Sequence, residues 1–178
     1  PDIGRFRTNL FQQRGEFALA MRHVKTDVPS FVDLNLTSIV QKISEEHRGI
    51  VLVAGSTGSG KSTTLAAMIE HINDHARKHI ITLEDPIEFV FEDNQSVIEQ
   101  REIGLDTKTF VQGLKHVLRQ DPDVIMLGEL RDFDSADVAL KAAQTGHLLL
   151  TSMHTHSISE AMHRCHGLGV DMLSLLYI

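Results

Sequence analysis

From residue 49 onward, short apolar runs alternate with longer stretches in which apolar residues recur at helical spacing. Runs that are apolar throughout are typical of strands covered on both faces of a parallel sheet. The alternation therefore predicts an α/β domain in which helices flank a parallel sheet. We expect strands at 50–54, 79–83, 123–127 and 147–151. We expect helices at 61–75, 107–119, 135–144 and 157–167, with Thr107 and Ser135 as N-caps and Asp121-Pro122 as a stop.

The pattern before residue 49 is different. Residues 5–24 alternate between apolar and polar side chains around a turn at 12–15, which predicts a β-hairpin. Because no partner strands precede it, we expect this hairpin to be the end of another domain. A linker with a proline break follows, then short helices at 31–34 and 38–47 capped by Ser30 and Thr37. Residues 87–103 predict a β-ribbon inserted between core elements.

A glycine-rich run at 55–62 fits the pattern G-x-x-x-x-G-K-[ST] in full. It lies between a predicted strand and a predicted helix, where glycine N–H groups and a helix dipole together favour bound phosphate. A glycine-rich turn with a chance lysine would not explain that coincidence. The pattern assigns Lys61 to the β- and γ-phosphates and the Ser62 hydroxyl to Mg²⁺. The predicted phosphate-binding residues are Gly55, Ser56, Thr57, Gly58, Ser59, Gly60, Lys61, Ser62 and Thr63.

Hydrolysis also needs carboxylates near the metal and the attacking water. Glu84, Asp85 and Glu88 follow one predicted strand, which favours a metal or water site, although a solvated acidic turn has the same spacing. Glu129 follows another strand at the position of a Walker B acid, but Gly128 replaces the usual aspartate before it. Taken alone, this glycine weakens the case for hydrolysis.

Histidines flank the predicted strand at 147–151. His147 stands at its start and His154 just beyond its end, where a histidine could sense a γ-phosphate or relay a subunit contact.

Composition narrows the class of protein. The net charge of −7 argues against a surface that coats nucleic acid. A single cysteine, Cys165, excludes an internal disulfide and suits a reducing compartment. No segment reaches the roughly 18 apolar residues of a membrane span. The chain starts at Pro1 and ends on an uncapped apolar stretch, so we expect a fragment of a longer cytoplasmic protein.

Four segments in order resemble the secretion ATPase family that drives type IV pili and type II secretion. They are a Walker A motif at 55–62, an aspartate box at 81–89, an atypical Walker B motif at 118–132 and a histidine box at 145–155. The resemblance implies a P-loop NTPase with a RecA-like parallel sheet, preceded by the end of a PAS-like α+β N-terminal domain. The implied boundaries are 1–28 for the PAS-like part, 29–48 for the linker and short helices, and 49–178 for an ATPase domain whose C-terminal end is missing.

The same resemblance implies roles for the acids and arginines. Glu88 becomes the water-activating carboxylate, and Glu129 becomes the working acid beside a glycine that is normal in the family. In such motors, arginines of the N-terminal domain reach the phosphates and neutralise charge in the transition state. The implied supporting residues are Glu84, Asp85, Arg131, His147 and His154, and the candidate arginine fingers are Arg5, Arg7, Arg14 and Arg22.

The resemblance implies a Mg²⁺-dependent ATPase that works as a homohexamer in the bacterial cytoplasm. It would reach the membrane only through a platform protein of the pilus or secretion machine, and it would bind no nucleic acid. Residues 13–15 and 100–107 favour pilus retraction, whereas 166–172 resembles the extension and type II secretion motors. Two rival functions are a nucleic-acid translocase and a regulatory subunit that binds ATP without hydrolysing it.

Overall fold

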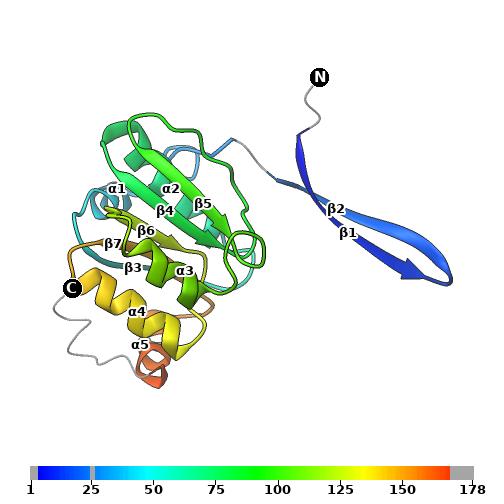
Figure 1. Ribbon diagram of the computed structural model, residues 1–178. Coiled ribbons are helices and arrows are strands. Elements are labelled where there is room, and N and C mark those ends of the chain that lie inside the picture. Colours follow the sequence, from blue (N-terminus) through cyan, green and yellow to red (C-terminus); the bar gives the residue numbers. More distant parts are fainter. Residues whose placement is uncertain (1–3, 25–26, 169–178) are drawn as a thin grey trace.

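The computed structural model describes residues 4–24 and 27–168. It contains a two-stranded hairpin and a five-stranded sheet packed between helices (Figure 1). Part of the predicted linker and the terminal stretch 169–178 lie outside the described residues. In the described part of the chain, no helix is long and apolar enough to cross a membrane.

The sheet has the order β3-β7-β6-β4-β5, and every neighbouring pair of strands is parallel. This arrangement confirms the predicted α/β class with a parallel sheet. The four strands expected from the apolar runs are present, each within two residues of its predicted bounds. The strands are β3 (Gly49–Ala54), β4 (His79–Glu84), β5 (Val97–Glu102), β6 (Val124–Leu127) and β7 (Leu148–Met153).

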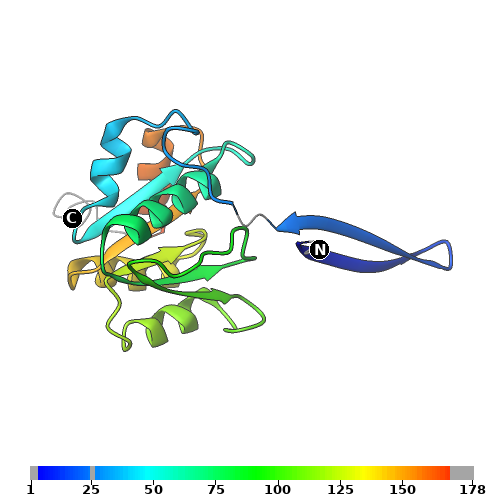
Figure 2. The same cartoon turned by 90° about the horizontal axis from the view of Figure 1, so that it is seen from above.

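Helices cover both faces of the sheet (Figure 2). Alternate residues of a strand point to opposite faces, so each strand contributes to two separate cores. Ile80 and Met126 pack with α2, whereas Ile81 and Leu127 pack with α3, α4 and α5. The helices are α1 (Ser38–Ser44), α2 (Lys61–His75), α3 (Phe110–Val117), α4 (Phe133–Gln144) and α5 (Ile158–Gly167).

The predicted β-ribbon at 87–103 is wrong. Its second half is β5, which pairs in parallel with β4 as an edge strand of the main sheet, and 87–91 is a loop rather than a strand. The stretch 31–34 forms a hydrogen-bonded turn instead of a helix, and α1 ends at Ser44.

Two predicted helix caps are also wrong. Thr109 caps α3 in place of Thr107, because its side chain accepts a hydrogen bond from the backbone of Gln112. Asp132 caps α4, and Ser135 lies inside that helix and donates to the Asp132 carboxylate. The N-cap of α4 is therefore the Asp132 carboxylate, three residues before the serine hydroxyl that the sequence predicts for this role.

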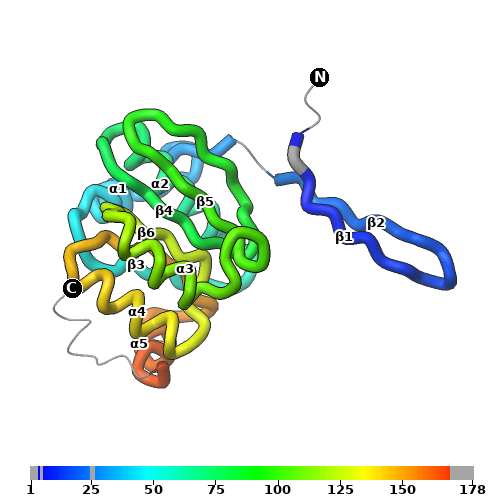
Figure 3. Tube along the Cα trace, in the orientation of Figure 1, coloured from blue at the N-terminus to red at the C-terminus, as the bar shows by residue number. Residues whose placement is uncertain are grey.

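The N-terminal hairpin pairs β1 (Arg5–Gln13) with β2 (Glu16–Val24) in antiparallel register, which confirms the predicted hairpin. Its turn residues Arg14 and Gly15 both have positive φ, as a two-residue hairpin turn of the primed type requires. The hairpin extends away from the sheet and its helices (Figure 3). Leu10, Phe17 and Met21 are exposed on it, so this ribbon has no core of its own in the described chain.

Candidate functional site

A pocket of about 470 Å³ lies where the loops after β3, β4, β6 and β7 meet. These strands are parallel, so their carboxyl ends converge at one edge, which is where ligands bind in open α/β sheets. Most of the site residues predicted from sequence line this pocket. They are Thr57, Gly58, Gly60, Lys61, Ser62, Thr63, Glu84, Asp85, Glu88, Glu129, Arg131 and His154, together with Arg22 from the hairpin.

The glycine-rich loop leads directly into the N-terminus of α2. Gly58 and Gly60 have φ values of 77° and 96°, a conformation that L side chains rarely adopt. A side chain at Gly55 would collide with Ser59, because an added Cβ would overlap the Ser59 hydroxyl oxygen. The loop is thus a tight turn that exposes backbone N–H groups and a helix N-terminus, which together suit a phosphate group.

Lys61 is 8% exposed although it carries a charge. Its ammonium donates to the carbonyls of Gly55 and Ser56 at 3.0 and 2.8 Å, and lies 3.2 Å from Nδ1 of His154. These contacts compensate for the desolvation of a buried charge. Because the lysine is the donor, Nδ1 of His154 must accept, and the proton of the neutral ring lies on Nε2.

The opposite nitrogen of His154 faces Glu129. Nε2 lies 3.7 Å from Oε1 of Glu129, whose side chain is 14% exposed. The other carboxylate oxygen accepts from Nε of Arg131 at 2.7 Å, and Arg131 also reaches Asp85 at 3.3 Å. The hydrogen bond with Glu129 is the main cause that raises the pKa of Arg131. His154 therefore contacts Lys61 of the phosphate loop and lies close to Glu129, whereas Arg131 links Glu129 to the acidic loop after β4.

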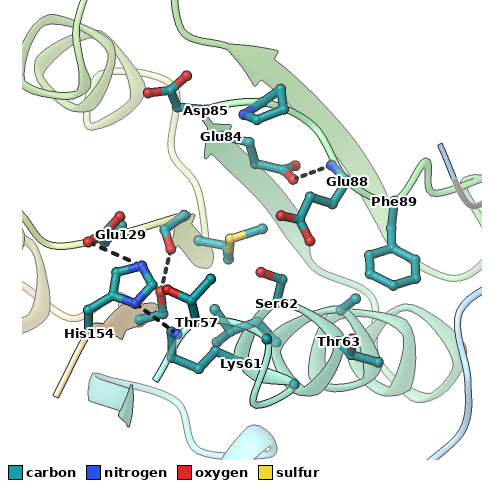
Figure 4. Close-up of a pocket in the computed structure, with 18 of the residues that line it drawn as sticks. Thr57, Lys61, Ser62, Thr63, Glu84, Asp85, Glu88, Phe89, Glu129 and His154 are labelled. Atoms are coloured by element: carbon teal, nitrogen blue, oxygen red, sulfur yellow. Dashed lines mark hydrogen bonds and ion pairs between the residues drawn. The ribbon is translucent and has the colours of Figure 1, made fainter. Parts of the chain in front are cut away.

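Glu84 and Glu88 form the acidic wall of the pocket (Figure 4). Glu84 is buried at the end of β4, where it accepts from the Thr82 hydroxyl at 2.7 Å and from the Gln100 amide at 3.0 Å. Burial raises the pKa of Glu84, and these hydrogen bonds offset part of that effect. The backbone N–H of Glu88 lies 3.5 Å from the second Glu84 oxygen, while the Glu88 carboxylate points into the pocket on the side of Ser62.

The residues expected to hold Mg²⁺ have the right chemistry for it. Ser62 and Glu129 line the same pocket, and hydroxyl and carboxylate oxygens are the ligands that Mg²⁺ prefers. Within 4–24 and 27–168, no cluster of three or more His, Cys, Asp or Glu residues forms a metal cage.

Several predicted residues lie outside this pocket. His147 lies at the other end of β7, where Nδ1 contacts the Ala142 carbonyl at 2.8 Å. Arg14 occupies the hairpin turn, and Arg7 lines a smaller adjoining cavity with Glu88 and Arg22. The backbone of Arg5 belongs to β1, but its side chain is outside the described part.

Sequence reasoning missed the apolar and amide groups of the site. Phe89, Phe91, Phe110 and Met126 line the pocket, and Gln100 bonds to its acidic wall. Met126 sits near a strand end and could have been found from that position. Phe89 ends the aspartate box and Gln100 begins the segment 100–107, but neither side chain had a predicted role in the site. Phe91 and Phe110 lie outside the four motifs, so only the fold brings them to the pocket.

Comparison with known proteins decides the family. The profile of the family described as Type II/IV secretion system protein matches residues 19–176. The chain belongs to this family. The twitching motility protein of Neisseria gonorrhoeae is 48% identical over 164 residues, which are 92% of this chain and 44% of that protein. The type II secretion system protein E of Aeromonas hydrophila is 41% identical over 134 residues, 75% of this chain and 26% of that protein.

A solved structure shows the same fold. The crystal structure of the pilus retraction motor PilT with bound ADP matches with a TM-score of 0.89 and 48% identity, over 92% of this chain and 48% of that one. The likeness confirms the RecA-like P-loop fold. The chain spans less than half the length of each of these three proteins.

The buried Glu84 carboxyl predicts a pH-dependent stability difference. Because burial raises its pKa in the folded state, the folded protein binds the proton more tightly, and wild-type stability falls as pH rises above the ordinary pKa of a glutamate. Glu84→Gln removes this dependence. We expect the free energy of unfolding of the variant, relative to wild type, to increase between pH 5 and pH 8.

Urea unfolding at several pH values measures this difference. The exposed Glu46→Gln variant controls for the loss of one negative charge at the surface. A Glu84→Gln difference that stays constant or shrinks as pH rises would contradict the prediction.

Proposed function

We propose that the protein containing this chain is a motor ATPase that hydrolyses ATP to drive type IV pilus retraction. The observation that carries this proposal is the convergence of Lys61, Glu88 and Glu129 on one pocket beside a phosphate-binding loop. The relatives support it, since their names include a twitching motility protein and a pilus retraction motor with bound ADP. The rival within the family is pilus extension or type II secretion, which the protein E relative keeps open.

The phosphate loop and other polar side chains of the pocket have defined tasks in this proposal. The N–H groups of the glycine loop and the ammonium of Lys61 bind the phosphates, so Lys61 exchanges its present carbonyl partners for phosphate oxygens. Ser62 and Glu129 would hold Mg²⁺, which neutralises charge on the β- and γ-phosphates when it is bound. Glu88 orients the attacking water and accepts its proton. His154 forms a hydrogen bond with Lys61 and lies between it and Glu129.

The assembly and the domain boundaries are part of the proposal. The hairpin within 1–28 belongs to a PAS-like domain, 29–48 is the linker, and 49–178 is part of the ATPase domain. The motor is a cytoplasmic homohexamer that pulls through a platform protein of the bacterial inner membrane. Arg22 supports this view, because it comes from the hairpin and yet lines the pocket that also contains Lys61 and Glu88. Domain movement between hairpin and sheet would then change the charge facing the phosphates.

Three substitutions test hydrolysis. We expect Glu88→Gln to lower kcat by about a hundredfold or more while ATP binding is retained, because the variant cannot accept a proton.

The other two substitutions remove binding groups. Lys61→Ala should abolish ATP binding, because Lys61 binds the phosphates in this proposal. Glu129→Gln should raise the Mg²⁺ concentration needed for half-maximal turnover, because Glu129 would hold the cation. Phosphate release and binding of a fluorescent ATP analogue measure these effects in the full-length protein. Wild-type turnover no higher than that of Lys61→Ala would overturn the ATPase proposal.

A second comparison selects the arginine that acts on the phosphates. We expect Arg22→Gln to lower kcat by about a thousandfold or more, because a guanidinium that neutralises the transferring phosphoryl group has effects of this size. Arg14→Gln should have kcat within about twofold of wild type, since Arg14 occupies the hairpin turn. Steady-state ATPase assays of both variants decide between them. Equal loss in both variants would remove Arg22 from its special role.

Deletion of the gene in its own organism separates the two branches. A retraction motor leaves cells with abundant pili that no longer retract, so twitching is lost. An extension motor leaves cells without pili, and a type II secretion motor leaves exoproteins inside the cell. Electron microscopy of pili, together with a twitching assay, measures the outcome. Bald cells would overturn the retraction assignment and leave the ATPase assignment intact.

A further inference from the structure

The loop that carries Glu88 is held by side chains of the neighbouring strand β5. The backbone N–H of Ile87 donates to the Glu102 carboxylate at 3.1 Å. The carbonyl of Phe89 accepts from the Gln100 amide nitrogen at 2.9 Å, and the N–H of Phe91 donates to the Gln100 amide oxygen at 2.9 Å. Every second residue of the loop is thus attached to β5, and Glu88 lies between two of these attachment points.

The Gln100 side chain forms three hydrogen bonds around this loop. Its amide nitrogen also donates to Oε1 of Glu84 at 3.0 Å, so that nitrogen contacts both the end of β4 and the loop. A glutamine amide has two N–H donors and one carbonyl acceptor. Both donors and the acceptor are therefore used, and together they join Glu84, Phe89 and Phe91.

Strand pairing sets where Gln100 stands. In the parallel register, Thr82 is opposite Gln100 and Glu84 is opposite Glu102. Residues 100 and 102 are two apart on β5, so their side chains project from the same face of the strand and meet the loop. The Glu88 carboxylate points into the pocket, on the side of Ser62 (Figure 4).

We propose that Gln100 is a positioning residue that fixes the loop 85–91 and thereby the place of the Glu88 carboxylate. The proposal rests on the ATPase function proposed above. A base works only when it lies within hydrogen-bond reach of the proton it accepts. A misplacement of about 1 Å can lower the rate by about a hundredfold. Gln100 never touches the substrate in this role, and its effect passes entirely through the loop.

Two substitutions separate the bonds from the volume of the side chain. Gln100→Met keeps the length of the side chain and removes all three hydrogen bonds. Gln100→Glu keeps the acceptor for Phe91, loses both donors and places a second carboxyl group beside Oε1 of Glu84. The matched control is Glu99→Gln on the same strand, because Glu99 has a 45% exposed side chain and pairs with Arg101 instead of the loop.

We expect both Gln100 variants to lower kcat by about tenfold to a hundredfold in the full-length protein. Binding of a fluorescent ATP analogue should change less than threefold, because the phosphate loop is untouched. Amide hydrogen exchange of residues 85–93 should become faster in both variants and stay unchanged in Glu99→Gln. An unchanged thermal unfolding midpoint of Gln100→Glu would confirm that the fold survives.

The outcomes are distinguishable from failure of the ATPase proposal. A kcat within twofold of wild type in both variants would overturn the positioning role. A fall in kcat that matches an equal loss of ATP binding would also overturn it, because a general disturbance of the pocket would explain both. If wild-type turnover equals the Lys61→Ala background, the ATPase proposal fails. In that case unchanged exchange in the loop refutes the attachment by Gln100, and faster exchange supports it.

Discussion

The register of β4 with its two neighbours is the constraint on which the acidic part of the site depends. Leu83 pairs with Leu127 on β6, so β4 and β6 end at the same level of the sheet. The backbone N–H of Gly128 donates to the Leu83 carbonyl at 2.8 Å. On the other side, Glu84 pairs with Glu102 on β5. One strand thereby places the loop of Glu88 beside the loop of Glu129. A slip of one residue would turn these side chains to the other face.

Two cations of the pocket, Lys61 and Arg131, have polar partners within the protein. Lys61 rests on two carbonyls and His154, while Arg131 pairs with Glu129 and Asp85. Each cation is therefore compensated, which lowers the cost of burying charge near the sheet edge. Phosphates that bring several negative charges would compete with Glu129 for Arg131 and with the loop carbonyls for Lys61. Such competition would couple the binding of phosphates to the positions of these acids.

Sequence predicted the elements whose signals are local. The phosphate loop, the strand before it and α2 (61–75) are encoded in one continuous stretch, and α2 has the predicted bounds. The sequence predicts β5 as part of a ribbon and not of the main sheet for two reasons. Val97–Glu102 is apolar only at its start, as suits an edge strand. Its partner strand β4 ends thirteen residues before β5 begins, so the pairing is not local. His147 shows a different limit. A motif that is continuous in sequence can span a whole strand, and six residues at about 3.3 Å each separate its ends by about 20 Å.

Gly128, the residue before Glu129, lies close to the end of β4. A Cβ at Gly128 would lie 3.5 Å from Glu84 Cα and from the Leu83 carbonyl oxygen, so a small side chain fits by volume. An aspartate would nevertheless add a further acid next to the backbone of Glu84, whose pKa is already raised by burial, and of Asp85. Like charges at such separation raise each other's pKa and favour neutral acids. Because the loop after β4 already supplies carboxylates to this wall, Gly128 leaves Glu129 as the acid of its own loop that faces Arg131 and His154.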